Sequence, residues 1–187
     1  MVSEVDKAVQ ALKEGKVILY PTDTIWGLGC DPTNDEAVSK IFSIKKRNDG
    51  KALIVLIEEI GQLYNYVDNI PEIAWDIVEF AEKPLTVIYP TGRNVSSKLL
   101  ADDGSIAIRL TKDDFCKKVI RKFGKGIVST SANISGEKSP SSFTKISKEV
   151  LESVEHIVSH RQNENMQVPP STIMKIELDG EVKFIRK

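Results

Sequence analysis

Cysteine and histidine are both scarce in this sequence, which contains two of each among its 187 residues. Cys30 and Cys116 are far apart and form no Cys-x-x-Cys pair, so the sequence indicates neither a disulfide framework nor a zinc-binding motif. We expect both thiols to be small buried groups. His156 and His160 are four residues apart, but two histidines at this spacing do not make a metal site by themselves. We therefore expect no metal site built from protein side chains.

Long apolar runs are also absent, and neither sign of charge predominates. The longest apolar stretches have the length of a strand, which argues against a transmembrane helix and a membrane partner. Apolar residues make up 41% and charged residues 28%, a balance that excludes a disordered chain. The formal net charge of −1 argues against a surface that coats polyanions, although it allows a local basic patch. We expect one domain over residues 1–187 and, without a secretory leader, a cytoplasmic protein.

Helical and extended patterns alternate along much of the sequence. Apolar residues recur at helical spacing after Ser3 and after Asn34 or Asp35, whose side chains can cap helices, and again from about Asp113. Continuous apolar runs predict buried strands, and Asp179-Gly180 between two late runs predicts a hairpin. The expected helices are 2–12, 35–47, 58–66, 71–81, 113–122 and one that ends near 154, and the expected strands are 16–20, 52–57, 85–89, 105–110, 127–129, 157–158, 172–176 and 182–185. This order predicts an α/β domain with an open, twisted, mixed parallel and antiparallel sheet flanked by helices.

Two short segments combine hydroxyl groups with glycine where a strand is expected to end. The segment 21–29 (PTDTIWGLG) follows the strand 16–20, and the segment 129–136 (STSANISG) follows the apolar pair 127–128. Ligands of open α/β sheets bind at the ends of strands, so we interpret the two segments as walls of one pocket. We expect Gly27 and Gly29 to make the first segment flexible. They match neither a GxGxxG fingerprint nor a Walker P-loop, so the usual nucleotide folds are not indicated.

Several side chains in and near these segments suit phosphate groups. Ser129, Ser131 and Asn133 alternate, so an extended backbone would place their donors on one face. A turn stabilised by the same side chains is the alternative. Arg47 can bind two oxygens of a phosphate group in a bidentate manner, and Lys51 can reach the same anion. A solvated helix end is the alternative for these two cations.

Arg109 lies between Ile108 and Leu110 in an expected strand. A half-buried arginine needs a carboxylate, either that of a substrate or that of a structural Asp or Glu. We expect Asp23 mainly to stabilise its loop, and Trp26 to wall the pocket with its aromatic face. No Ser-His-Asp arrangement and no paired carboxylates are visible, so the sequence favours positioning of substrates over covalent catalysis. No catalytic residue is assigned.

In order and spacing, the segment 21–29, the basic run 45–47, the stretch 105–109 (SIAIR) and the segment 129–136 resemble the YrdC-type threonylcarbamoyl-AMP synthases. The resemblance covers about residues 15–186 and implies a YrdC/RibB-like fold with a large concave cavity. It implies an L-threonylcarbamoyladenylate synthase, in which L-threonine takes up bicarbonate or CO2 and the resulting carbamate attacks the α-phosphorus of ATP, with Mg2+ carried by the nucleotide. A separate transferase would then modify adenosine 37 of ANN-decoding tRNAs.

The resemblance also assigns side chains to the two substrates. For L-threonine it implies Thr24, Arg109 and Ser171. For ATP it implies Arg47, Lys51, Ser105, Ser129, Ser131, Asn133, Ser139 and Arg186. The sequence departs from the family at two places: Leu56 stands where the family often has histidine, and Lys51-Ala52 replaces the residues that are usual there.

Two other functions remain open at this point. A concave basic surface would also suit a module that binds structured RNA or tRNA, which predicts a steep salt dependence and no need for threonine. A domain similar to the carbamoyl-adenylate-forming part of hydrogenase maturation proteins would use carbamoyl phosphate instead. Such domains usually belong to much longer chains, so this alternative is the less favoured of the two enzyme readings.

Overall fold

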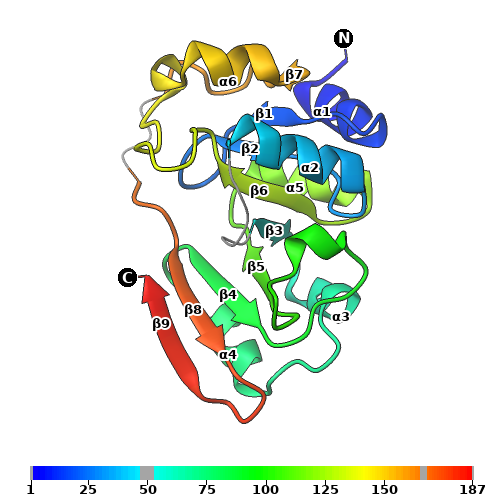
Figure 1. Ribbon diagram of the computed structural model, residues 1–187, viewed down its shortest axis with the longest axis vertical. Coiled ribbons are helices and arrows are strands. Elements are labelled where there is room, and N and C mark those ends of the chain that lie inside the picture. Colours follow the sequence, from blue (N-terminus) through cyan, green and yellow to red (C-terminus); the bar gives the residue numbers. More distant parts are fainter. Residues whose placement is uncertain (1, 47–52, 165–167, 187) are drawn as a thin grey trace.

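The computed structural model describes residues 2–46, 53–164 and 168–186 (Figure 1). Its helices are α1 Glu4–Lys13, α2 Asp35–Ile44, α3 Leu63–Tyr66, α4 Ile73–Glu79, α5 Asp114–Phe123 and α6 Lys148–Ser153, with 3₁₀ turns at Ile60–Gln62, Ser97–Leu99 and Phe143–Lys145. Its strands are β1 Ile18–Tyr20, β2 Gly27–Gly29, β3 Ile54–Ile57, β4 Leu85–Tyr89, β5 Ile106–Leu110, β6 Ile127–Ser131, β7 His156–Ile157, β8 Thr172–Ile176 and β9 Val182–Arg186.

Capping side chains fix where the ten-residue helices begin. Ser3 and Asp6 form a reciprocal capping box at the start of α1, and the side chains of Asn34 and Asp113 accept backbone N–H bonds at the starts of α2 and α5. Helix α5 ends at Gly124, whose φ of +86° is a left-handed conformation that glycine adopts readily. These helix starts confirm the sequence prediction. Among the described residues, no helix is long and apolar enough to cross a lipid bilayer.

Within the described residues, nine strands form one sheet in the order β7-β1-β2-β6-β3-β5-β4-β8-β9. The pairs β1–β7, β3–β5 and β4–β8 are parallel. The other neighbouring strands are antiparallel. The predicted mixed sheet is therefore confirmed, as is the hairpin at Asp179-Gly180, which joins β8 to β9.

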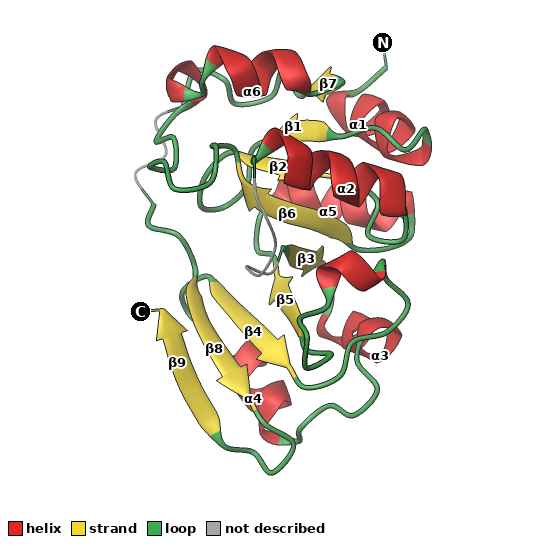
Figure 2. Ribbon diagram, viewed as in Figure 1, coloured by secondary structure: helices red, strands yellow, loops and turns green. Residues whose placement is uncertain are grey.

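Helices pack on both faces of the sheet, and each face has its own cluster of buried apolar side chains. On one face, residues of α2, α3 and α4 such as Ile41, Leu63 and Ala74 contribute to the larger cluster. On the other face, α1 and α5 contribute to a cluster that includes Leu56 of β3 and Ile127 of β6. Figures 1 and 2 show α4 behind β4 and β8, so these strands turn their other face toward the viewer.

Residues 27–29, expected to be a flexible loop, form strand β2 instead. Gly27 is paired with Tyr20 of β1, and β2 is also paired with β6. Backbone hydrogen bonds to two neighbours thus outweigh the low strand propensity of glycine. A Cβ atom at Gly29 would lie 2.6 Å from Cε1 of Tyr20 and 2.7 Å from the carbonyl oxygen of Val128. Glycine at this position therefore permits a close approach of neighbouring groups, which is a different role from flexibility.

Candidate functional site

Strand register places predicted site residues from distant parts of the sequence on one face of the sheet. Leu56 of β3 is paired with Arg109 of β5, and Ile54 is paired with Ser129 of β6. Paired residues share a face, and so do residues two apart in one strand. Arg109 and Ser129 therefore lie on the same face as Leu56, which is the face that α1 and α5 cover in part.

This face continues across β4, β8 and β9. Ile88 of β4 is paired with Ala107 of β5, so Thr86, two residues before Ile88, also lies on it. Thr86 is paired with Ile173, and Ile173 is paired with Arg186. The face therefore collects these predicted residues, two of which immediately precede their strands: Ser105, Arg109, Ser129, Ser131, Ser171 and Arg186.

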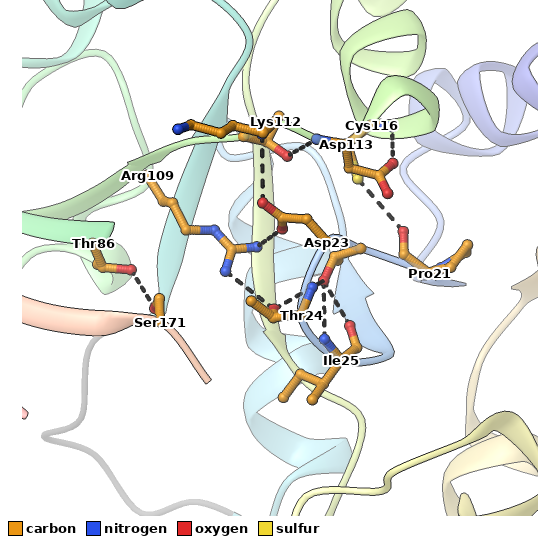
Figure 3. A network of polar contacts seen from close by, with 12 residues as sticks. Pro21, Asp23, Thr24, Ile25, Thr86, Arg109, Lys112, Asp113, Cys116 and Ser171 are labelled. Atoms are coloured by element: carbon orange, nitrogen blue, oxygen red, sulfur yellow. Dashed lines mark hydrogen bonds and ion pairs between the residues drawn. The ribbon is translucent and has the colours of Figure 1, made fainter. Parts of the chain in front are cut away.

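Arg109 is the centre of a polar network that joins β5 to the segment 21–29 (Figure 3). Its Nη2 donates to Oδ1 of Asp23 at 3.0 Å, and its Nη1 donates to Oγ1 of Thr24 at 3.2 Å. The Arg109 side chain is 5% exposed and that of Asp23 is 15% exposed, so the ion pair is largely shielded from water. Two residues predicted to bind L-threonine are thus in direct contact, and the protein's own carboxylate partner for Arg109 is Asp23.

Ser171 and Arg186 form a second polar group on the same face. The hydroxyl oxygens of Ser171 and Thr86 are 2.8 Å apart, and both residues are buried. Arg186 donates to the carbonyl oxygen of Ser171 from Nη2 at 2.7 Å and from Nε at 3.2 Å. Burial lowers the pKa of Arg186, and the guanidinium of Arg109 lowers it further. Among the described residues, Asp23 supplies the one carboxylate that is ion-paired with either arginine, so the surplus positive charge favours an anionic ligand.

The end of β6 carries Ser129 and Ser131 on this face, but Asn133 does not continue the alternation. The backbone N–H of Asn133 donates to the carbonyl oxygen of Ser131 at 2.9 Å, so the chain turns directly after the strand. Nδ2 of Asn133 donates to the carbonyl oxygens of Ile134 and Glu137. For Asn133 the structure thus shows the turn, and both amide hydrogens are engaged. Its buried Oδ1 has no hydrogen-bond partner among the described residues and can accept one from a ligand.

Lys45 ties this turn to the end of α2. The residue is 3% exposed, and its Nζ donates to the carbonyl oxygen of Ser131 at 2.7 Å and to that of Asn133 at 2.8 Å. The next residue, Lys46, has an exposed side chain that is ion-paired with Glu149. Lys45 is thus the member of this pair that the structure places beside the candidate site.

Replacing Lys45 by methionine is expected to lower the free energy of unfolding by about 1–3 kcal/mol, because the buried carbonyl group of Asn133 and the partly buried one of Ser131 lose a donor. Urea-induced unfolding followed by circular dichroism measures this loss. The matched control is Lys46→Met, which removes an exposed ion pair that contributes about 0–1 kcal/mol. Equal losses in the two variants would contradict the structural role of Lys45.

Ser105 and Ser139 are not part of the Arg109 network. Ser105 precedes β5, four residues or about 13 Å of extended chain from Arg109. Hydrogen bonds from the Ser105 hydroxyl and from Lys175 lower the pKa of Asp103 to about 2. Ser139 is half-buried in the loop that follows β6. Contacts of these two serines with a nucleotide remain predictions.

Contrary to expectation, Trp26 does not line the candidate site on this face of the sheet. It is fully buried in the apolar cluster on the opposite face, with its ring centroid 5.0 Å from that of Phe143. The large indole is thus part of the core. Leu56, where the resembled family often has histidine, is fully buried and paired with Arg109. That position therefore adjoins the polar network but presents an apolar side chain.

Thr22, Thr86 and Lys45 belong to this region but are absent from the predicted site. A signal for Thr86 exists in the sequence, because it is a polar residue within the apolar run 85–89. Its hydroxyl therefore had to find a buried partner. Lys45 is one of three consecutive cations, and no local pattern tells which of the three turns inward.

A cavity of about 450 Å³ opens elsewhere in the protein, between α1 and β7, where Glu14, Lys16 and Glu155 are among the lining residues. None of the predicted site residues lines it. Arg47 and Lys51 lie outside the described residues, so their phosphate contacts and the large concave cavity stay predictions. Within the described part of the chain, no group of three or more His, Cys, Asp or Glu residues could hold a metal ion.

The family model Sua5/YciO/YrdC, described as telomere recombination, matches residues 10–187. A threonylcarbamoyl-AMP synthase of Pseudoalteromonas translucida is 37% identical over 183 residues, which cover 96% of each chain. A threonylcarbamoyl-AMP synthase of Idiomarina loihiensis is 34% identical over 157 residues, covering 82% of this chain and 83% of that one.

Solved structures show the same fold. P. abyssi Sua5 complexed with L-threonine matches with a TM-score of 0.84 and 27% identity, covering 94% of this chain and 52% of that chain. This chain thus spans about half the length of that Sua5. E. coli YciO matches with a TM-score of 0.85 and 22% identity, covering 98% of this chain and 88% of that chain, and supports the fold alone.

Proposed function

Because the chain belongs to the Sua5/YciO/YrdC family, we propose that it is an L-threonylcarbamoyladenylate synthase. Such an enzyme makes threonylcarbamoyl-AMP and pyrophosphate from L-threonine, bicarbonate or CO2, and ATP. The observation that carries the proposal is the 37% identity to a threonylcarbamoyl-AMP synthase over 96% of both chains. The cationic face around Arg109 and Arg186 supports it, because a carboxylate and a triphosphate are the anions that this reaction requires.

In this proposal Arg109, Thr24 and Ser171 hold L-threonine. Nη1 and Nη2 of Arg109 each carry a second hydrogen beyond those donated to Thr24 and Asp23, so the guanidinium can still bind a carboxylate. Its Nε is buried and has no hydrogen-bond partner among the described residues. Asp23 keeps the guanidinium in place, which reduces the ordering required when the substrate binds.

The nucleotide is proposed to lie along the same face, beside the amino acid. Its binding is assigned to Arg47, Lys51, Ser105, Ser129, Ser131, Asn133, Ser139 and Arg186. Arg186 offers a guanidinium that is tethered by the carbonyl oxygen of Ser171, so the two substrate sites are joined through one residue. Asn133 is assigned here as an acceptor, since its amide hydrogens are already engaged.

The chemistry requires positioning more than covalent participation by the protein. The amino nitrogen of threonine bonds to the carbon of CO2 and loses a proton, which gives a carbamate. A carbamate oxygen then attacks the α-phosphorus, and the bond to the bridging oxygen breaks so that pyrophosphate leaves with the electron pair. Arg109 and Arg186 would hold the two reactants in line and offset their negative charge. Mg2+ would arrive on the ATP phosphates and neutralise them, and we assign it no protein ligand.

The product is a reactive mixed anhydride, which can transfer its threonylcarbamoyl group to a nucleophile. We propose that a separate transferase takes the threonylcarbamoyl group to adenosine 37 of ANN-decoding tRNAs, and that both act in the cytoplasm. Direct contact of this chain with tRNA is not required for that sequence of steps.

The test measures ligand-dependent stability and product formation in the purified protein. L-threonine and ATP are each expected to raise the melting temperature, because a ligand that binds only the folded state stabilises it by mass action. Pyrophosphate is expected to appear only when L-threonine, bicarbonate and ATP are all present.

The alternative functions give different results in the same assay. Pyrophosphate formation that needs carbamoyl phosphate and ignores L-threonine would show a carbamoyl-adenylate-forming domain instead. Binding of structured RNA with a steep salt dependence, without any response to L-threonine or ATP, would show an RNA-binding module. Either result would overturn the proposed synthase.

A further inference from the structure

Thr22, which is not among the predicted site residues, makes several hydrogen bonds with Thr24 and Ile25. It is 1% exposed, and its hydroxyl donates to the carbonyl oxygen of Ile25 at 2.7 Å. The same oxygen accepts the backbone N–H of Thr24 at 3.1 Å and, more weakly, that of Ile25 at 3.3 Å. Because a threonine hydroxyl carries one hydrogen, Thr22 has none left to give to a further acceptor.

This arrangement fixes the direction of the bond between the two threonine hydroxyls, whose oxygens are 3.1 Å apart. Thr22 has already donated its hydrogen to a carbonyl oxygen, so Thr24 is the donor in this contact, and its hydrogen shares the two lone pairs of Thr22 Oγ1 with the two backbone N–H groups. On its other side, Thr24 Oγ1 receives a hydrogen from Nη1 of Arg109, since a guanidinium can only donate (Figure 3). The Thr24 hydroxyl has thus used its hydrogen and one of its two lone pairs.

The geometry points to Thr22 as the positioning residue that makes Thr24 an acceptor toward the substrate. This inference rests on the proposed function, and it specifies the direction of the hydrogen bonds in that site. Thr24 accepts a hydrogen bond from the substrate, and the adjacent Arg109 donates hydrogen bonds to it. The substrate must therefore present a hydrogen donor beside its carboxylate. An amino acid with a β-hydroxyl has two such donors, the α-amino group and the hydroxyl group.

Calorimetric titration of three compounds distinguishes these donors. L-2-aminobutyrate lacks the hydroxyl group of L-threonine, and (R)-3-hydroxybutyrate lacks its amino group. We expect the unsubstituted protein to bind at least one of the two about tenfold or more weakly than L-threonine, because a buried acceptor is then left without a partner. If both analogues bound as tightly as L-threonine, the inference would be wrong, and no variant is needed for that conclusion.

The variant Thr22→Val tests the positioning role. It keeps the shape of the side chain but frees the Thr24 hydroxyl to turn its hydrogen toward the substrate. The ratio of the dissociation constant of the more weakly bound analogue to that of L-threonine is the preference of the protein. This preference is expected to fall by about three- to tenfold in the variant. Thr22→Ser should restore that preference, because it retains the hydroxyl. Thr91→Val is the matched control, since the buried Thr91 Oγ1 has no hydrogen-bond partner among the described residues.

A purely structural role of Thr22 predicts a different outcome. A damaged loop would weaken the binding of all three compounds by a similar factor and leave the preference unchanged. That result, or unchanged affinities, would overturn the inference while L-threonine binding upholds the proposed function. No binding of L-threonine by the unsubstituted protein would overturn both.

Discussion

Arg109→Met is expected to reduce threonine-dependent pyrophosphate formation by a factor of about 10³ or more, because the variant loses both the cation for the substrate carboxylate and the donor to Thr24. It is also expected to lower the free energy of unfolding by about 3–5 kcal/mol. The reason is that Asp23, whose side chain is 15% exposed, would lose the cationic partner 3.0 Å away. Steady-state assays and urea unfolding measure the two effects separately.

A second substitution separates stability from activity. In Asp23→Asn/Arg109→Met the carboxylate is removed as well, so much of the lost stability should return, whereas activity should not. Arg93→Met is the matched control, because Arg93 and Asp68 form an exposed ion pair that contributes about 0–1 kcal/mol. Near-normal pyrophosphate formation by a folded Arg109→Met protein would remove Arg109 from the proposed site.

Gly29→Ala is the second large effect that we expect, with a loss of about 2–4 kcal/mol in the free energy of unfolding. The new methyl group would lie 2.6 Å from Cε1 of Tyr20 and 2.7 Å from the carbonyl oxygen of Val128. The tyrosine ring can move only by disturbing the buried cluster around it, and the carbonyl group belongs to the neighbouring strand β6. Both obstacles therefore persist after relaxation.

The control for this prediction is Gly61→Ala, where the added methyl group meets no atom within 4 Å. That variant is expected to be neutral or to gain about 0.4–1 kcal/mol through reduced freedom of the unfolded chain. Thermal unfolding followed by calorimetry compares the two. A Gly29→Ala protein as stable as Gly61→Ala would mean that glycine at position 29 is not needed for close packing.

Local patterns in the sequence were sufficient for the helices and most strands. Ser3 and Asn34 indicate helix starts because a cap acts within a few residues of itself. Strand β2 escaped prediction because its two glycines have low strand propensity, and only pairing with β1 and β6 makes them extended.

In the candidate site, too, some features depend on neighbouring residues in the sequence and others on contacts between distant parts of the chain. The sequence offered Arg109 and Asp23 as separate residues, 86 positions apart, and only the tertiary fold brings the loop that contains Asp23 to Arg109 of β5. Asn133 was expected to continue the alternation of β6, but its own backbone bond to Ser131 ends the strand. Trp26 was expected at the pocket because aromatic residues often line ligand sites, yet its bulk is buried in the core. A local sequence pattern does not predict which distant residues pair with each other or on which face of the sheet a large side chain is buried.

Arg109 and Arg186, of which Arg109 alone has an ion-paired carboxylate among the described residues, also bear on the solution conditions under which the protein is handled. Arg109 and Arg186 lie within electrostatic reach of each other, and Asp23 offsets one of the two charges. Small oxyanions such as inorganic phosphate and sulfate have the geometry that guanidinium groups prefer. We expect such buffer ions to compete with the substrate for these arginines and to raise its apparent KM. A chloride buffer with a bulky zwitterion lacks this competition, so the apparent KM measured in it should be lower.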